Sequence, residues 1–432
     1  MDMTPSFLAD LLTRVAVIGR GLSAQTDRTP LADLCAELVA GRGEATSLAL
    51  AGSILDRIAA LDPAQKRAFL IELLARFGPD ESRLAEAFAA YQAKPGPASL
   101  RALHAASEPA SQELIRRLNR TPGGTAALVR LRAELLTFLK DSPELAALDG
   151  DFRHLFASWF NRGFLELRQI DWSTPAEILE KIIAYEAVHE IRGWDDLRRR
   201  VAAPDRRLYA FFHPAMRHDP LIFVEVALTD AIPTNIPAIL AEDRPRLRPE
   251  AATTAVFYSI SNCQEGLRGI SFGNFLIKQV VEELRRDFDT LTTFVTLSPV
   301  PGLRRWAEAE ASREAPRLTA AQAALVARLG TTPEASTDPA LAGLAARYLA
   351  LPDGPGTGAR DPVARFHLGN GARLERIHLG ADPSPNGLKS AWGVMVNYLY
   401  DLGSIEKNHE AFANHGEIIA SPAVQRLARA TK

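Results

Sequence analysis

Two residues of the sequence have the type and the setting to carry out chemistry, Ser298 and His367. Ser298 directly follows a β-like run, Leu291–Leu297, and a Pro-Val-Pro sequence stiffens the chain after it. His367 lies in Arg365-Phe-His-Leu-Gly-Asn-Gly371, a polar, glycine-rich segment that we expect to be a loop, and loops often carry functional groups. A serine can orient a substrate by hydrogen bonding, and a histidine can move a proton near neutral pH. The alternative for Ser298 is structural, since many such serines only cap a turn.

A glycine-rich turn further upstream has the features of an anion-binding element. It lies between a strand-like run, Thr254–Ile260, and a segment with helical apolar spacing, Phe275–Arg286. Gly269 and Gly273 in the turn permit close approach of a ligand to the backbone, and the N-terminus of the following helix favours an anion. The spacing is neither that of the dinucleotide fingerprint nor that of a P-loop. The alternative is a tight connection without a ligand.

The remaining histidines have simpler interpretations. His213 and His218 flank a turn, but no third ligand stands at metal-binding spacing, so no metal site is predicted. His378 lies in an apolar strand and is expected to be a core residue. The polar segments around His189, His409 and His415 predict exposed side chains. No G-x-S-x-G elbow surrounds Ser298, so a serine hydrolase is not predicted.

Composition limits the class of protein and its partners. The chain has 432 residues, 47% hydrophobic and 24% charged, which is typical of a globular protein of more than one domain. A net charge of −2 argues against nucleic acid or an anionic membrane as a partner. No apolar run is long enough to cross a bilayer. Two distant cysteines, Cys35 and Cys263, predict a reducing compartment and neither a disulfide framework nor a cysteine metal site.

The elements that must position these residues fall into two parts. From Phe7 to about Arg168 the chain is rich in Ala, Leu, Arg and Glu, with proline breaks, and predicts successive helices. Further on, β-like runs predict the strands of one central sheet, and a helical insertion is predicted at 307–351. The predicted runs are 207–212, 220–228, 254–260, 291–297, 374–379 and 393–400. We therefore predict a helical domain, residues 1–168, with a structural or oligomerising role, and a second domain, residues 169–432, built on one central sheet.

Several blocks of the sequence, in order, resemble malonyl-CoA decarboxylases. They are Phe257-Tyr-Ser-Ile-Ser261, Gln264–Lys278, Thr296-Leu-Ser-Pro-Val-Pro-Gly302, Phe366-His-Leu-Gly-Asn-Gly-Ala372 and Trp392-Gly-Val-Met-Val-Asn-Tyr398. The resemblance covers about Trp172 to Tyr400. It implies an α+β protein, an all-α helical-bundle N-terminal domain followed by a GNAT-like α/β catalytic domain with a central mixed sheet.

The resemblance also implies site residues. Ser298 and His367 match the family's catalytic serine and histidine, the serine being described there as the proton acceptor. The malonyl-CoA-binding loop is expected to comprise Arg268, Gly269, Ile270, Ser271, Phe272, Gly273 and Asn274, and Ser298 and His367 also belong to the binding site. Ser271 and Phe272 stand where some members have an acidic residue, so an acidic partner for His367, if needed, must come from elsewhere. Arg268 and Lys278 are further candidates for contact with CoA phosphates.

The predicted activity is decarboxylation of malonyl-CoA to acetyl-CoA and CO2, in malonate or fatty-acid metabolism. The thioester is itself the electron sink, so no cofactor and no metal are expected. We expect a homo-oligomer, a dimer or tetramer. A cytoplasmic location is also expected, because Ala430-Thr-Lys432 is not a peroxisomal signal. The alternatives are a GNAT-type acyltransferase, which would need an amine acceptor, and a non-catalytic acyl-CoA sensor. The preference for malonyl-CoA over methylmalonyl-CoA stays open, because one methyl group discriminates by only about 1–3 kcal/mol.

Overall fold

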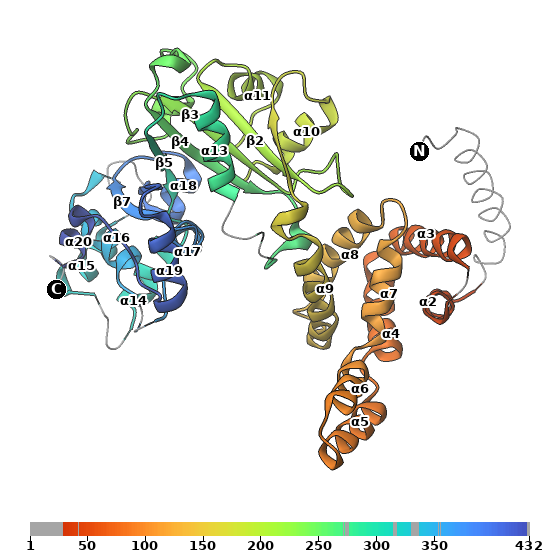
Figure 1. Ribbon diagram of the computed structural model, residues 1–432. Coiled ribbons are helices and arrows are strands. Elements are labelled where there is room, and N and C mark those ends of the chain that lie inside the picture. The colour runs from red at the N-terminus through yellow and green to blue at the C-terminus, as the bar shows by residue number, and fades with distance from the viewer. Residues whose placement is uncertain are drawn as a thin grey trace. The chain divides into compact units, whose positions relative to one another are not determined.

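The computed structural model (Figure 1) describes residues 29–41, 43–270, 272, 276–313, 318–329, 337–352, 354 and 356–429. The chain forms two compact units. The helical unit comprises Met1–Leu165, His213–Arg217 and Gln264–Phe272. The sheet unit comprises Glu166–Phe212, His218–Cys263 and Gly273–Lys432. The predicted start of the helices at Phe7 lies outside the described residues. No helix in the described ranges is long and apolar enough to span a membrane.

The helical unit consists of short helices that bury apolar side chains such as Leu34, Ile54, Leu114 and Leu128 against one another. Prolines and glycines separate the helices as expected, and Asp62 forms a capping box ahead of Pro63. The helices are α2 (Leu31–Ala40), α3 (Glu44–Ala60), α4 (Pro63–Phe77), α5 (Glu81–Ala93), α6 (Pro97–Ser107), α7 (Ala110–Asn119), α8 (Gly124–Phe138) and α9 (Ala146–Trp159), with short 3-10 turns η1 (Pro143–Leu145), η2 (Arg162–Phe164) and η4 (Glu265–Leu267).

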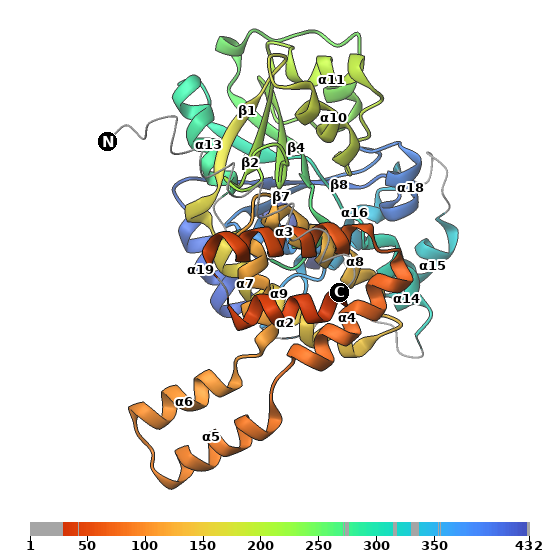
Figure 2. The same ribbon diagram turned by 90° about the vertical axis from the view of Figure 1, so that its right-hand side faces the viewer.

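The α5–α6 hairpin differs from the other helices of this unit. Figure 2 shows it projecting away from α2, α4 and α7, and α5 has no buried residue. Phe88 on α5 is 50% exposed and Leu100 on α6 is 54% exposed. The two helices therefore pack mainly on each other.

The sheet unit is built on one mixed sheet in the order β1-β2-β3-β4-β5-β8-β6, with β7 paired to β8. Among the paired strands of the described residues, only β4 and β5 are parallel, and the other pairs are antiparallel. The six predicted β-runs are all strands. The strands are β1 (Glu166–Ile170), β2 (Arg206–Phe212), β3 (Ile222–Thr229), β4 (Thr254–Asn262), β5 (Thr293–Thr296), β6 (Ser298–Pro299), β7 (Arg373–His378) and β8 (Met395–Leu399).

Helices cover both faces of this sheet. The predicted insertion is helical, because α14, α15 and α16 lie between β6 and β7. The helices are α10 (Ala176–Tyr185), α11 (Trp194–Val201), α12 (Pro237–Leu240), α13 (Leu276–Asp287), α14 (Leu303–Ala311), α15 (Ala320–Arg328), α16 (Ala340–Ala350), α17 (Pro362–Gly369), α18 (Pro385–Ala391), α19 (Ile405–His415) and α20 (Pro422–Arg429), with the 3-10 turn η3 (Pro249–Ala251). The predicted α+β class, helices first and a mixed sheet after, is confirmed.

The strands place alternate residues on the two faces of the sheet. On β4, Val256 and Tyr258 join an apolar cluster with Ile239 and Met395, whereas Phe257 points to the other face and meets Tyr400 with ring centroids 6.3 Å apart. A second cluster, including Ile182, Leu197 and Phe223, packs α10 and α11 against β2 and β3. The catalytic candidates lie where β5, β6 and β8 meet.

Candidate active site

Ser298 and His367, far apart in sequence, are brought into direct contact. Ser298 is the first residue of β6 and pairs with Val396 of β8. Its Oγ lies 3.1 Å from His367 Nε2 and donates to Thr296 Oγ1 at 2.9 Å. Ser298 is 5% exposed and His367 is 3% exposed, so the pair is buried.

An interruption of the β-ladder fixes the position of Ser298. Between the pairs Val295–Leu399 and Ser298–Val396, side chains replace backbone hydrogen bonds. The Asn397 Nδ2 donates to the Thr296 carbonyl at 2.7 Å, and the Tyr398 N–H donates to Thr296 Oγ1 at 3.1 Å. The fully buried Asn397 is held in turn by His378, whose Nε2 contacts its Oδ1. These bonds set the geometry of the strand immediately before the serine.

His367 lies in a helix, so the expectation of a loop was wrong. Helix α17 begins with Pro362, a favoured first helical residue, and Asp361 caps it. The Asp361 Oδ1 accepts hydrogen bonds from the backbone N–H of Val363 at 2.9 Å and of Ala364 at 3.1 Å. The Asp-Pro signal was present in the sequence, but the glycines that follow His367 obscured so short a helix. The helix gives His367 a rigid support.

A tyrosine contacts the second nitrogen of His367. The Tyr400 hydroxyl lies 2.8 Å from Nδ1, and the ring of Tyr398 stacks on the imidazole with centroids 4.6 Å apart. Sequence reasoning left open an acidic partner for His367; the contact found is a neutral hydroxyl. Both tyrosines were missed as site residues, although Tyr398 ends a block that carries the family resemblance.

Burial makes this site electrically neutral. It lowers the pKa of His367 to about 3, because an imidazolium would lose its hydration there. It also raises the pKa of Tyr400 well above its usual value. With both groups neutral, Tyr400 can donate to Nδ1, the Nε2–H of His367 to Ser298 Oγ, and Ser298 to Thr296. Each of these four side chains then has a hydrogen-bond partner, as buried groups require.

The glycine-rich turn is only partly described. Arg268, Gly269, Ile270 and Phe272 are placed, whereas Ser271, Gly273 and Asn274 lie outside the described residues. Gly269 has a φ of 78°, a value that favours glycine, and the Arg268 side chain is 65% exposed beside Glu265. The placed residues of the turn belong to the helical unit, whereas Ser298 and His367 belong to the sheet unit.

A buried arginine holds this turn in the helical unit. Arg132, 1% exposed, donates to the carbonyls of Gly266 at 2.6 Å and Arg268 at 3.0 Å, and pairs with Asp149 at 2.8 Å. A Cβ at Gly266 would lie 1.8 Å from the Val129 carbonyl oxygen, so only glycine fits. This support was not predicted from the sequence.

The other candidates have structural settings. Lys278 pairs with Glu406 across α13 and α19, which favours a structural role for its charge. His218 contacts Glu177 at 3.1 Å, and His378 is partly buried against Asn397. Within the described residues, no group of three or more His, Cys, Asp or Glu side chains has the arrangement of a metal site.

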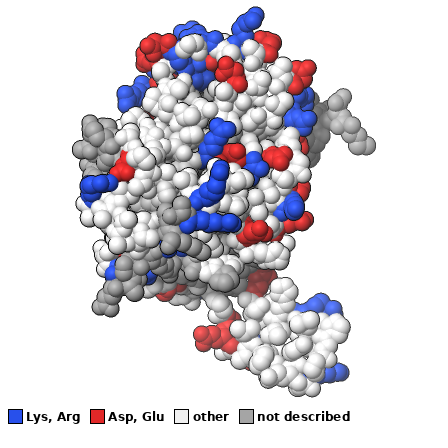
Figure 3. Space-filling model, turned by 90° about the vertical axis from the view of Figure 1, so that its left-hand side faces the viewer, with Lys and Arg blue, Asp and Glu red and all other residues white. Residues whose placement is uncertain are grey.

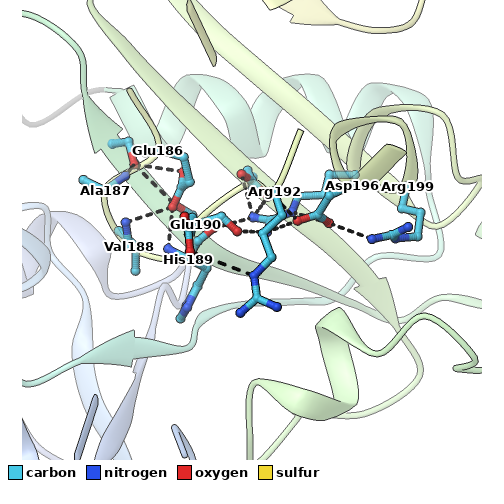
Figure 4. A network of polar contacts seen from close by, with 12 residues as sticks. Glu186, Ala187, Val188, His189, Glu190, Arg192, Asp196 and Arg199 are labelled. Carbon is cyan, nitrogen blue, oxygen red and sulfur yellow. Dashed lines mark hydrogen bonds and ion pairs between the residues drawn. The ribbon is translucent and has the colours of Figure 1, made fainter. Parts of the chain in front are cut away.

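A second buried polar cluster, shown in Figure 4, lies beside β3 and β4 of the sheet unit. Glu186 accepts from the Ser259 hydroxyl at 2.8 Å and from the backbone N–H of His189 at 2.7 Å. Arg200 pairs with Asp196 at 3.1 Å and with Glu225 at 3.4 Å. Burial raises the pKa of Glu225 to about 7. His189 is 8% exposed, so its predicted exposure was wrong.

The fold and the site define a class of protein: a helical N-terminal region followed by a mixed-sheet domain that holds a buried serine–histidine pair. Comparison with known families gives the family itself. The malonyl-CoA decarboxylase C-terminal domain matches residues 163–432, and the malonyl-CoA decarboxylase N-terminal domain matches residues 77–160. The chain belongs to the malonyl-CoA decarboxylase family.

Individual relatives agree with this membership. The mitochondrial malonyl-CoA decarboxylase of Anser anser anser is 36% identical over 84% of this chain and 80% of its own length. The crystal structure of malonyl-CoA decarboxylase from Rhodopseudomonas palustris is 51% identical, with a TM-score of 0.88, and covers 92% of this chain and 98% of that one. The crystal structure of malonyl-CoA decarboxylase from Agrobacterium vitis is 53% identical, with a TM-score of 0.86, and covers 92% of this chain and 99% of that one. The predicted family is confirmed.

Proposed function

We propose that this enzyme decarboxylates malonyl-CoA to acetyl-CoA and CO2, with Ser298 and His367 as its catalytic pair. The observation that supports these roles is the 3.1 Å contact between Ser298 Oγ and His367 Nε2 in a buried, neutral site. In the reaction, the bond between the carboxylate carbon and the α-carbon breaks, and its electron pair moves onto the thioester oxygen. The resulting enolate then accepts a proton at the α-carbon.

A buried, poorly solvated site suits the bond-breaking step. The substrate carboxylate loses hydration on entering such a site, and this loss is relieved when the carboxylate leaves as uncharged CO2. The negative charge that moves to the thioester oxygen needs a hydrogen-bond donor, and such donors typically contribute about 3–4 kcal/mol to the transition state. The Ser298 hydroxyl can donate a hydrogen bond to the substrate carboxylate or to the thioester oxygen once it no longer donates to Thr296.

The second step needs a proton donor, and the low pKa of free His367 explains how one arises. A neutral imidazole that gave up its Nε2 proton would become an anion, which is unfavourable. A substrate carboxylate beside the ring stabilises the imidazolium and raises its pKa. His367 then binds a proton at Nδ1 together with the substrate and delivers its Nε2 proton to the α-carbon. The Tyr400 hydroxyl changes from donor to acceptor at Nδ1 and keeps Nε2 directed at the reacting carbon.

The test is mass-resolved analysis of CoA products from purified protein and malonyl-CoA alone. We expect acetyl-CoA with an equal amount of CO2. Free CoA would indicate thioester hydrolysis, and turnover only with an added amine would indicate an acyltransferase. Tight binding of malonyl-CoA without any product would favour a sensor and contradict the proposal.

We also propose that the enzyme is a cytoplasmic homo-oligomer that serves malonate or fatty-acid metabolism. The two cysteines are free and buried, which suits a reducing compartment. The apolar side chains exposed on α5 and α6 support association through the helical unit. Light scattering of the purified chain should give the mass of a dimer or tetramer, and a monomeric mass would contradict this part of the proposal.

A further inference from the structure

A hollow of about 550 Å³ lies in the sheet unit beside the start of α14. Its walls come from α14, from Tyr348 on α16, and from the segment between 357 and 365 that leads into α17. The side chains that matter for its chemistry are Arg305, Trp306, Arg360 and Arg365. The volume is in the range of small-molecule sites, and the site assignments above do not use these four residues.

The lining of this hollow is positively charged. It contains three arginines and no carboxylate among the described residues, in a chain whose net charge is −2. Arg365 donates to the carbonyls of Ala359 at 3.3 Å and Arg360 at 2.8 Å, and Arg360 donates to the carbonyl of Leu351. The bonds of Arg365 to neutral carbonyls hold its guanidinium group without cancelling its charge. Figure 3 shows Lys and Arg side chains, with Asp and Glu among them, on the side of the molecule where Figure 1 places α15 and α16.

Aromatic rings form another part of the lining. Trp306 and Tyr348 have ring centroids 5.1 Å apart, and the Arg360 guanidinium lies 5.5 Å from the Trp306 centroid. Guanidinium groups recognise phosphates by paired, charge-assisted hydrogen bonds, and an indole offers a flat face to a planar ring. The combination fits a ligand that carries both a phosphate and an aromatic base.

The floor of the hollow connects to the helix that carries His367. The Tyr348 hydroxyl donates to Asp361 Oδ2 at 3.1 Å, and the Gly302 N–H points to the same oxygen at 3.4 Å. The other oxygen of Asp361 caps α17. A Cβ at Gly302 would lie 2.1 Å from the Tyr348 hydroxyl oxygen, so glycine is required for this contact. Movement of Tyr348 on ligand binding would therefore shift the support of His367.

We propose that this hollow is a nucleotide-binding site, in which Arg305 and Arg365 contact phosphate and Trp306 contacts the base. Two sources share this chemistry: the nucleotide end of a CoA thioester and a free adenine nucleotide. The binding itself is independent of the proposed catalytic roles, whereas its effect on turnover through Asp361 rests on them.

Direct binding to the full-length chain is the first test, by isothermal titration calorimetry with adenosine 3′,5′-bisphosphate and with ADP. We expect saturable binding of at least one probe, weakened about tenfold or more in Arg305→Gln/Arg365→Gln, because charge-assisted hydrogen bonds are lost. Arg313→Gln is the matched control, since Arg313 follows α14, is exposed and pairs with Glu310. Its affinity should be unchanged. Failure of both probes to bind, or equal affinity in the double variant, would overturn the proposal.

Two further measurements define the ligand. Trp306→Leu should weaken nucleotide binding and leave pyrophosphate binding unchanged; an equal loss of affinity for both would remove the base contact from the proposal.

Inhibition of malonyl-CoA turnover by the bound probe then distinguishes the nucleotide end of the substrate from a free adenine nucleotide. Competitive inhibition identifies the nucleotide end of the substrate, and a change in kcat alone identifies a separate effector. Because calorimetry needs no turnover, loss of the site and failure of the proposed catalytic mechanism remain distinguishable.

Discussion

The sheet unit holds two buried polar clusters, and they offset the free-energy cost of burying polar groups in opposite ways. Around Arg200, a full positive charge is buried and matched by Asp196 and Glu225. Around His367, burial instead removes the charge, and neutral hydrogen bonds join Ser298 and Tyr400. A buried charge that is already paired interacts only weakly with an added ligand. A neutral site with a titratable group can respond when a substrate brings a charge in, so the second cluster is suited to chemistry.

The largest effect should follow from removal of the titratable group. We expect His367→Gln to lower kcat with malonyl-CoA by about 10²–10⁴-fold, the usual contribution of a positioned acid or base. The folded structure should persist, because glutamine can keep one hydrogen bond. The measurement is acetyl-CoA formation at saturating substrate, with thermal unfolding recorded in parallel.

The exposed His415 provides the control for this substitution, and His415→Gln should have the turnover of the unaltered enzyme. Ser298→Ala should also lower turnover by orders of magnitude. Near-normal turnover in His367→Gln would show that another group delivers the proton. It would contradict the conclusion that the neutral cluster is the one suited to chemistry.

In the charged cluster the largest effect should be on stability. Arg200→Met leaves the buried Glu225 without this cation and removes one of the two arginines that pair with Asp196, and breaking a buried ion pair costs about 3–5 kcal/mol. Urea unfolding measures this loss. Arg199→Met is the control, because Arg199 pairs with Asp196 and Glu242 at a half-exposed position, where we expect less than about 1 kcal/mol. Equal stability of Arg200→Met and the parent chain would contradict a structural role for the cluster.

The two clusters should give opposite dependences of stability on pH. The pKa of His367 falls from 6.5 to about 3 on folding, so its contribution is present above pH 6.5 and is lost as the pH falls towards 3. The pKa of Glu225 rises from 4.5 to about 7, so its contribution is present below pH 4.5 and is lost as the pH rises through 7. The free energy of unfolding is measured from pH 4 to 8. In His367→Gln the decrease in stability towards low pH should become smaller, and in Glu225→Gln the decrease in stability towards high pH should become smaller. Unchanged slopes would contradict these assignments.

A smaller effect should come from a residue that touches only the support of Ser298. Asn397→Leu leaves the Thr296 carbonyl without its 2.7 Å donor, and an unpaired buried group costs about 1–3 kcal/mol. We expect kcat to fall about tenfold while KM changes little, because the serine is displaced and the remaining binding contacts are retained. His378→Gln, which can still donate to Asn397, should retain most of the activity. A KM effect without a kcat effect would place Asn397 in substrate binding instead.

These positioning residues show what the sequence could and could not predict. The strands and the helical half follow from local composition, and Ser298 and His367 follow from the family blocks. Asn397 and Tyr400 did not, because their roles arise from contacts between distant segments: Asn397 and Thr296 stand 101 positions apart. The burial of His189 was missed for the same reason, since its surroundings come from tertiary packing that a polar local sequence does not reveal.

The uptake of a proton when the substrate binds is the smallest effect to measure, and it is also the effect most specific to the neutral cluster. Binding of malonyl-CoA to Ser298→Ala, followed by calorimetry in two buffers of different ionisation enthalpy, should show up to about one proton taken up at pH 7. The double variant Ser298→Ala/His367→Gln should show none, because Tyr398 and Tyr400, which contact His367, have pKa values raised well above the usual value. Equal uptake in both variants would assign the proton elsewhere. Absence of uptake in both would mean that His367 meets the substrate as a neutral imidazole, and a proton on Ser298 or water would then have to reach the enolate.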